Sequence, residues 1–174
     1  VTLVSGLAAW LVSFGWRRVP GTLFVAGGGL KRNLLTIQAG LLSAPWGDIV
    51  IDSGFGARDA EEFGLEAYRS DSQARVNAAM RRARRIVFTH EHLDHMARLL
   101  RLPDFARVAP KALITPEQLR GNRWSDSLPW PESARERLKP FRYAGLTAIA
   151  PGVVLIRTPG HTPGSQMLYA RLAH

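Results

Sequence analysis

Short apolar runs separated by glycine and proline dominate the pattern of the chain and predict several short β-strands. Residues 48–52 read D-I-V-I-D, and three contiguous β-branched apolar residues are typical of a strand buried on both faces. Similar runs predict further strands at residues 22–26, 33–39, 85–89, 153–158 and 166–172. The first two of these are expected to form a hairpin.

Two stretches carry a helical pattern instead. Residues 60–83 are rich in Ala, Glu, Gln and Arg, with apolar residues at roughly helical spacing, and residues 95–102 end at a proline. Strands that alternate with helices are typical of a layered α/β protein. Residues 115–140 are polar and rich in proline, which predicts a long loop over the surface.

The N-terminal segment has a pattern of its own. Residues 1–16 carry no charged side chain and are mostly apolar, and two arginines follow directly. A membrane anchor and a buried or loose helix are the two interpretations, although about 20 apolar residues are needed to span a bilayer. The W-R-R run at residues 16–18 resembles an interfacial stop and favours the anchor. We therefore expect an apolar segment at 1–18, a domain at 19–174, and a membrane-anchored or cytoplasmic protein.

Composition limits the chemistry that the chain can carry. Its 174 residues are enough for one domain with a hydrophobic core, and none of them is cysteine. Any metal site must therefore use histidine and carboxylate ligands, because thiolate zinc sites are excluded. The formal net charge is +9, but the arginines are scattered. Their dense run at residues 81–85 follows a helical stretch, whose dipole favours cations.

Four of the five histidines fall in two short segments. His90 and His92 are two residues apart at the end of a predicted strand, so both side chains leave the same face. Asp94 and His95 follow where the strand gives way to a helix. Asp94 alone could be the N-cap of that helix. Four metal-capable side chains within six residues, however, indicate a metal site.

His161 lies in a turn that is rich in proline and glycine, at the end of another predicted strand. A single histidine in such a turn is usually just exposed. Its place at a strand end, like that of His90, makes it the natural third ligand. Three neutral imidazoles and one water form the coordination shell of a catalytic zinc, with the water at the open position.

Three motifs resemble those of a known family. T-H-E-H-L-D-H at residues 89–95 is similar to the T-H-x-H-x-D-H motif that defines the metallo-β-lactamase superfamily. I-D-S-G at residues 51–54 resembles an earlier strand-end motif of this family, and P-G-H-T-P-G at residues 159–164 resembles the turn with its third histidine. The resemblance covers residues 22–174 and implies an α/β fold, an αββα four-layer sandwich with a binuclear metal site.

The resemblance also implies a role for each site residue. It places His90, His92 and His161 around metal 1, and it has Asp94 and His95 help hold metal 2. Zinc is the expected ion, one or two per chain, with iron or manganese as alternatives. The implied reaction is hydrolysis by a metal-activated water, in which Asp94 orients the hydroxide and takes its proton.

Asp52, from the I-D-S-G motif, is implied to fix the histidine loop and to orient a ligand histidine without binding the metal itself. Its residue type and position also allow a simpler interpretation, a turn former at the end of a strand.

The chain departs from the family pattern near its end. Family members continue with a strand that carries a metal-bridging Asp and with a last histidine ligand, and neither is recognisable here. His174 has no matching surroundings and is not assigned to the site. We therefore expect a C-terminally incomplete domain that holds at most one metal tightly, with exposed apolar residues near Leu168 and Leu172.

A small carboxylic ester, lactone or thioester is the expected substrate, because no extra motif of the family's nucleic-acid-processing branch is recognisable. Two alternatives stay open. One is a nuclease of the same fold, whose affinity for nucleic acid would fall steeply with salt. The other is a truncated module without catalysis. A membrane is an expected partner only through residues 1–16, and the sequence does not predict an oligomeric state.

Overall fold

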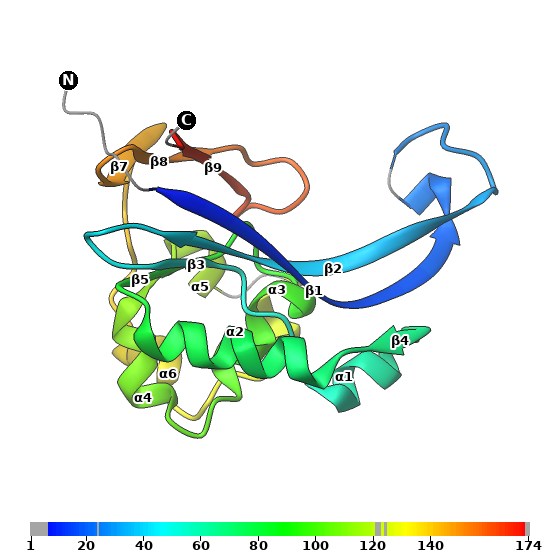
Figure 1. Cartoon of the computed structure of the whole chain (residues 1–174), viewed down its shortest axis with the longest axis horizontal. Coiled ribbons are helices and arrows are strands. Elements are labelled where there is room, and N and C mark those ends of the chain that lie inside the picture. Colours follow the sequence, from blue (N-terminus) through cyan, green and yellow to red (C-terminus); the bar gives the residue numbers. More distant parts are fainter. Residues whose placement is uncertain (1–6, 24, 121–122, 124, 173–174) are drawn as a thin grey trace.

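The computed structural model describes residues 7–23, 25–120, 123 and 125–172 (Figure 1). Its strands are β1 Ala8–Pro20, β2 Arg32–Ser43, β3 Ile49–Ile51, β4 Ala67–Tyr68, β5 Arg85–Val87, β6 Ala112–Leu113, β7 Leu146–Ala150, β8 Val153–Arg157 and β9 Gln166–Ala170. Its α-helices are α1 Ala57–Glu62, α2 Ser70–Arg82, α3 Leu93–Leu100, α4 Phe105–Val108, α5 Pro116–Leu119 and α6 Ala134–Arg137. Short 3-10 helices lie at Gly21–Leu23, Ala109–Lys111 and Ser125–Ser127.

The strands form two sheets. The first has the order β4-β1-β2-β3-β5-β6, and the second has the order β7-β8-β9. In the first sheet β3, β5 and β6 are parallel, whereas β1 and β2 form a long antiparallel hairpin. Helices α2, α3 and α4 lie on one side of this sheet and the second sheet lies on the other (Figure 1). The expected α/β fold with two facing sheets is confirmed.

Strand β3 is buried on both faces, as its contiguous apolar residues predict. Ile49 belongs to the core between the two sheets, where it is joined by Val87 of β5 and Val153 of β8. Its neighbour Val50 faces the other way and belongs to the core that includes Met80 of α2. Burial on both faces fixes the position of β3. Asp52, the first of the predicted site residues, directly follows this strand.

The second sheet exposes the face that points away from the first. Leu155 is 1% exposed and lies in the core between the sheets. Residues in the alternate register face the other way, and Leu146, Met167 and Tyr169 are 65%, 58% and 56% exposed. The expected exposure of apolar side chains near the last strand is confirmed. His174 lies outside the described residues.

The N-terminal segment differs from the expected helix or anchor, because its described residues are a strand. β1 pairs with β2 from Ala8 opposite Ser43 to Pro20 opposite Arg32, so residue 18 lies within the first sheet. The hairpin expected between residues 22–26 and 33–39 is instead formed by β1 and β2. No helix among the described residues is long and apolar enough to cross a bilayer. Residues 1–6 lie outside the described part of the chain.

Two further expectations need correction. The helix expected over residues 60–83 is two helices, α1 and α2, because Gly64 adopts a left-handed φ of 67° and β4 then pairs with β1. Residues 115–140 are not a loop over the surface, because they contribute Leu119 and Leu128 to the core beneath the first sheet, at 7% and 5% exposure. Burial of these leucines outweighs the polar composition around them.

Candidate metal centre

The ends of neighbouring parallel strands bring the predicted site residues together. β3 and β5 are parallel, so Asp52 and Thr89, which follow them, emerge at the same edge of the first sheet. The chain then runs into α3, whose N-cap is His92 and whose first turn carries Asp94 and His95. The end of β5 and the start of α3 therefore place the whole T-H-E-H-L-D-H run at this edge of the first sheet.

His90, His92 and His161 converge on one point, with His161 supplied by the turn between β8 and β9. One ring nitrogen of each lies within 4.8 Å of the others. Nδ1 of His92 is 3.0 Å from Nε2 of His90 and 3.3 Å from Nε2 of His161. A tetrahedral zinc with metal–nitrogen distances of about 2.0–2.1 Å would hold its nitrogens about 3.3 Å apart. The geometry of the three histidines therefore fits zinc.

The protonation states of two of these histidines also suit a metal. Burial, followed by the charges of His95 and His92, lowers the pKa of His90 to about 3. Burial and the charge of His161 lower the pKa of His92. A histidine must be neutral to donate a lone pair to a metal. His90 and His92 are neutral at pH 7, so protons need not be removed from them first.

His95 lies between two carboxylates. Its Nδ1 is 2.8 Å from Oδ2 of Asp52, and its Nε2 is 3.5 Å from Oδ2 of Asp94. Burial acts to lower the pKa of His95, but the charges and hydrogen bonds of Asp52 and Asp94 outweigh it and raise the pKa to about 10. Burial likewise acts to raise the pKa of Asp94, and His95 turns the net shift downwards. In the metal-free protein at pH 7, His95 is protonated and Asp94 is ionised.

Asp52 also holds the backbone of the histidine loop. The amide of Thr89 donates to Oδ1 at 2.7 Å, and the hydroxyl of Thr89 donates to Oδ2 at 2.8 Å. Asp52 itself has a left-handed φ of 62°, a conformation that Asp and Asn tolerate better than most residues. It therefore forms the turn at the end of β3 and contacts the histidine loop with the same side chain.

Sequence reasoning missed three polar residues beneath the histidines. Glu91, Gln118 and Thr162 are 0%, 0% and 2% exposed. Glu91 occupies a variable position of the motif, and Gln118 comes from a segment that was expected to be a surface loop. The alternation expected at a strand end could have drawn attention to Glu91, because a side chain between two histidines that share a face is expected on the opposite face.

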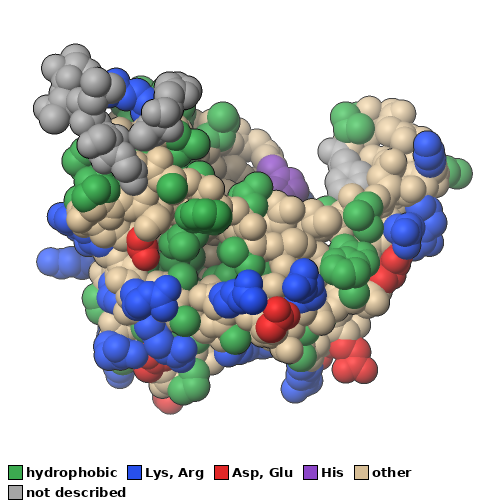
Figure 2. Space-filling view, viewed as in Figure 1, with side chains coloured by type: hydrophobic (Ala, Val, Ile, Leu, Met, Phe, Trp, Pro, Cys, Tyr) green, Lys and Arg blue, Asp and Glu red, His purple; other side chains and the backbone are tan. Residues whose placement is uncertain are grey.

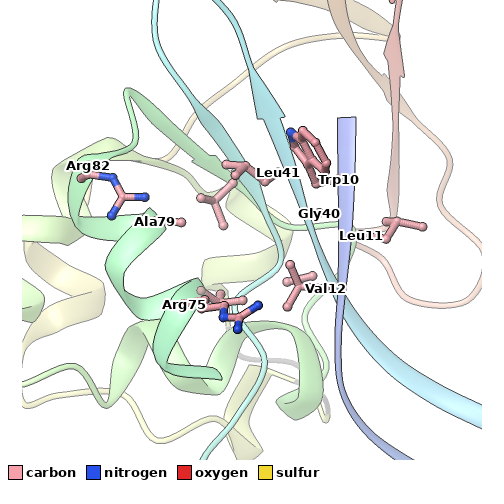
Figure 3. A pocket seen from close by; sticks show the side chains of 11 residues that line it. Trp10, Leu11, Val12, Gly40, Leu41, Arg75, Ala79 and Arg82 are labelled. Carbon is pink, nitrogen blue, oxygen red and sulfur yellow. The ribbon is translucent and has the colours of Figure 1, made fainter. Parts of the chain in front are cut away.

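The space around the histidines is separate from the apolar groove on the helix side of the first sheet. That groove lies between α2 and the strands β1 and β2, and Val12, Leu41, Arg75 and Arg82 line it (Figure 3). Its described lining contains none of the predicted site residues. A histidine side chain instead appears in the hollow between the second sheet and the far end of the β1–β2 hairpin (Figure 2).

Comparison with known proteins agrees with this geometry. The family model of the metallo-beta-lactamase superfamily matches residues 36–173, which is most of the chain and includes every site residue named above. The chain belongs to the metallo-β-lactamase superfamily. The resemblance of its motifs to this family is thereby confirmed. The chain is a metal-dependent hydrolase of the metallo-β-lactamase (MBL) fold. No curated protein matches the sequence.

Solved structures show the same fold at low identity. A quorum-quenching N-acyl homoserine lactone lactonase is similar with a TM-score of 0.71 and 18% identity, over 99% of this MBL-fold chain and 71% of its own. A probable metal-dependent hydrolase from Staphylococcus aureus has a TM-score of 0.69 and 15% identity, over 99% and 71%. The dizinc quorum-quenching lactonase AidC has a TM-score of 0.62 and 15% identity, over 98% and 69%.

Proposed function

We propose that this MBL-fold hydrolase holds zinc with His90, His92 and His161 and cleaves a small ester, lactone or thioester. The observation that carries the proposal is the convergence of the three imidazoles with nitrogen spacings of 3.0 and 3.3 Å. Such spacings match a three-histidine zinc site that leaves one position open for water or substrate. When bound, zinc would supply Lewis acidity and lower the pKa of water at that position.

Asp94 is the proposed proton acceptor. Its carboxylate is ionised at neutral pH because His95 holds its pKa low. It lies in the first turn of α3, next to the loop that carries His90 and His92. A carboxylate so placed can orient a water molecule by accepting its hydrogen bond and can then accept its proton. Asp94 and His95 are also the residues that would contribute to a second ion.

Among the three substrate classes, a lactone has the best support. The similar solved structures include a lactonase with N-hexanoyl-L-homoserine, its product, at the catalytic metal centre. Their identity to this chain is 15–18%, which supports the fold and makes a lactone the first substrate to test. Zinc is the first metal to test, because AidC is described as a dizinc enzyme, with iron and manganese as alternatives.

A hydrolysis panel with purified, zinc-loaded protein tests the proposal. It should contain an acyl homoserine lactone, an aryl ester, a thioester and, for the rival nuclease function, a phosphodiester. We expect turnover of at least one carboxylic substrate, and a loss of about 100-fold or more with Asp94→Asn, which removes the proton acceptor. Cleavage of the phosphodiester alone, or equal turnover by Asp94→Asn, would contradict the proposal.

A further inference from the structure

We infer that Glu91 is a positioning residue, whose buried carboxylate fixes the turn that carries His161 against the loop that carries His90 and His92. The inference rests on the proposed function, because positioning matters only if the three histidines hold a metal. Glu91 has no part in the proposed metal shell. We expect its effect on the metal to pass mainly through His161.

The contacts of Glu91 lead directly to the His161 turn. Its Oε2 accepts a hydrogen bond from the hydroxyl of Thr162 at 2.7 Å, and its Oε1 accepts one from the amide of Gly164 at 3.0 Å. These donors are one and three residues beyond His161. Glu91 lies between His90 and His92 where the chain bends, and its fully buried side chain reaches beneath the turn, whereas the rings of His90 and His92 are half-buried and converge with that of His161.

The fit between this carboxylate and the turn is close. A Cβ atom added at Gly164 would lie 2.5 Å from Oε2 of Glu91 and 2.6 Å from Cγ of Gln118. Gln118 also connects the turn to the histidine loop. Its Nε2 donates to the carbonyl oxygen of Phe88, which precedes the loop, and to that of Gly164 in the turn, each at 3.0 Å. The turn and the loop are therefore joined by side chains that have no access to solvent.

His161 needs such a support more than the other two histidines do. His90 and His92 follow a buried strand and begin a helix, whereas His161 is exposed and lies in a turn of Pro, Gly and Thr. An unrestrained turn would have to be ordered when the metal binds, and the cost of that ordering would reduce the affinity. Charge-assisted bonds from Glu91 to Thr162 and Gly164 order the turn in advance.

Zinc affinity, measured by competition with a chromophoric chelator, tests the inference through a double-mutant cycle. Glu91→Gln keeps the size of the side chain but loses its charge and one of its two acceptor oxygens. We expect it to weaken zinc binding about 10- to 100-fold, the usual cost of losing a group that orients a ligand. In a His161→Ala background the same change should cost less than about 3-fold, because the ligand that it positions is gone.

Two further variants keep the test decisive. Thr162→Val removes the bond to Glu91 at nearly constant shape, together with the contact of the same hydroxyl with Oγ of Ser165. It should repeat the pattern of Glu91→Gln even if that variant does not fold. Asp59→Asn is the control for the loss of a buried carboxylate away from the histidines, since Asp59 lies on α1, accepts the amide of Gly56 and pairs with Arg101. It should leave zinc affinity unchanged.

The outcomes separate the two claims. Equal losses in the two backgrounds, or no loss from both Glu91→Gln and Thr162→Val, overturn the positioning role while the zinc site stands. If His161→Ala binds zinc as tightly as the unmodified chain, the proposed function fails and the role of Glu91 fails with it. The absorption spectrum of the Co²⁺-loaded protein gives a second reading, since a displaced His161 would change the ligand geometry that the spectrum reports.

Discussion

Oδ2 of Asp52 lies 2.8 Å from Nδ1 of His95, although the two residues are 43 positions apart. The contact occupies one nitrogen of the ring and turns the other, Nε2, towards Asp94. It ties the end of β3 to the first turn of α3. A carboxylate that fixes a histidine in this way determines which nitrogen is offered to a metal and makes that nitrogen more basic.

Replacing Asp52 with Asn should weaken metal binding about 10- to 100-fold and leave the fold largely intact. The amide oxygen can still accept a hydrogen bond from the backbone of Thr89, so the turn survives. The carboxylate that accepts from the Thr89 hydroxyl is lost, however, and that hydroxyl lies 3.0 Å from Nδ1 of the proposed ligand His90. Zinc content and affinity measure the effect, with circular dichroism as the check on folding. Unchanged zinc affinity would reduce Asp52 to a turn former.

The same contact predicts how the stability of the metal-free protein depends on pH. His95 has a pKa of about 10 in the fold, against 6.5 for an ordinary histidine. The folded state thus binds this proton more tightly, so the contribution to the free energy of unfolding is complete below pH 6.5 and is lost as the pH rises towards 10. Urea unfolding between these limits, with a chelator present, should show the decline.

Asp52→Asn provides the control for that measurement. Without the neighbouring carboxylate, the pKa of His95 should lie closer to its ordinary value, and the decline should shrink. Identical slopes in both proteins would mean that another group titrates. The range below pH 6.5 is avoided because His90, whose pKa is lowered to about 3, has the opposite effect there.

Two glycines of the His161 turn should respond differently to a methyl group. A Cβ at Gly164 would lie 2.5 Å from the carboxylate of Glu91, whereas a Cβ at Gly160 meets nothing within 4 Å. Gly164→Ala should therefore cost about 1–3 kcal/mol of unfolding free energy through overpacking, and it should also weaken zinc binding. Gly160→Ala should change both quantities little. Thermal unfolding and zinc competition on the pair check this, and equal effects would contradict the packing around Glu91.

The clustering of the candidate ligands around His90 could be predicted from the sequence, because these residues are close together along the chain. His90, His92, Asp94 and His95 lie within six residues, and a strand followed by a helix gathers them at one edge without help from distant segments. The strand at Ile49–Ile51 was predicted for a similar reason, since its apolar run reports burial on both faces.

The features that escaped prediction depend on distant partners. Residues 8–16 are apolar enough for a helix, and only their pairing with β2 makes them a strand. Glu91 occupies a variable position of its motif, and nothing in the motif indicates its contact. It accepts a hydrogen bond from Thr162, 71 residues further along the chain. Leu119 and Leu128 lie in a polar stretch, and only the core that they join shows that it is not a loop over the surface.

The zinc affinity of the unmodified chain, compared with that of His161→Ala, is the decisive test of whether the three histidines share one metal ion. His161 comes from a different sheet than His90 and His92, so it reports whether the three imidazoles act together. We expect one tightly bound zinc per chain and a loss of zinc affinity with His161→Ala larger than the ~10- to 100-fold typical of a residue that only orients a ligand. Equal zinc affinity and stoichiometry in the two proteins would contradict it.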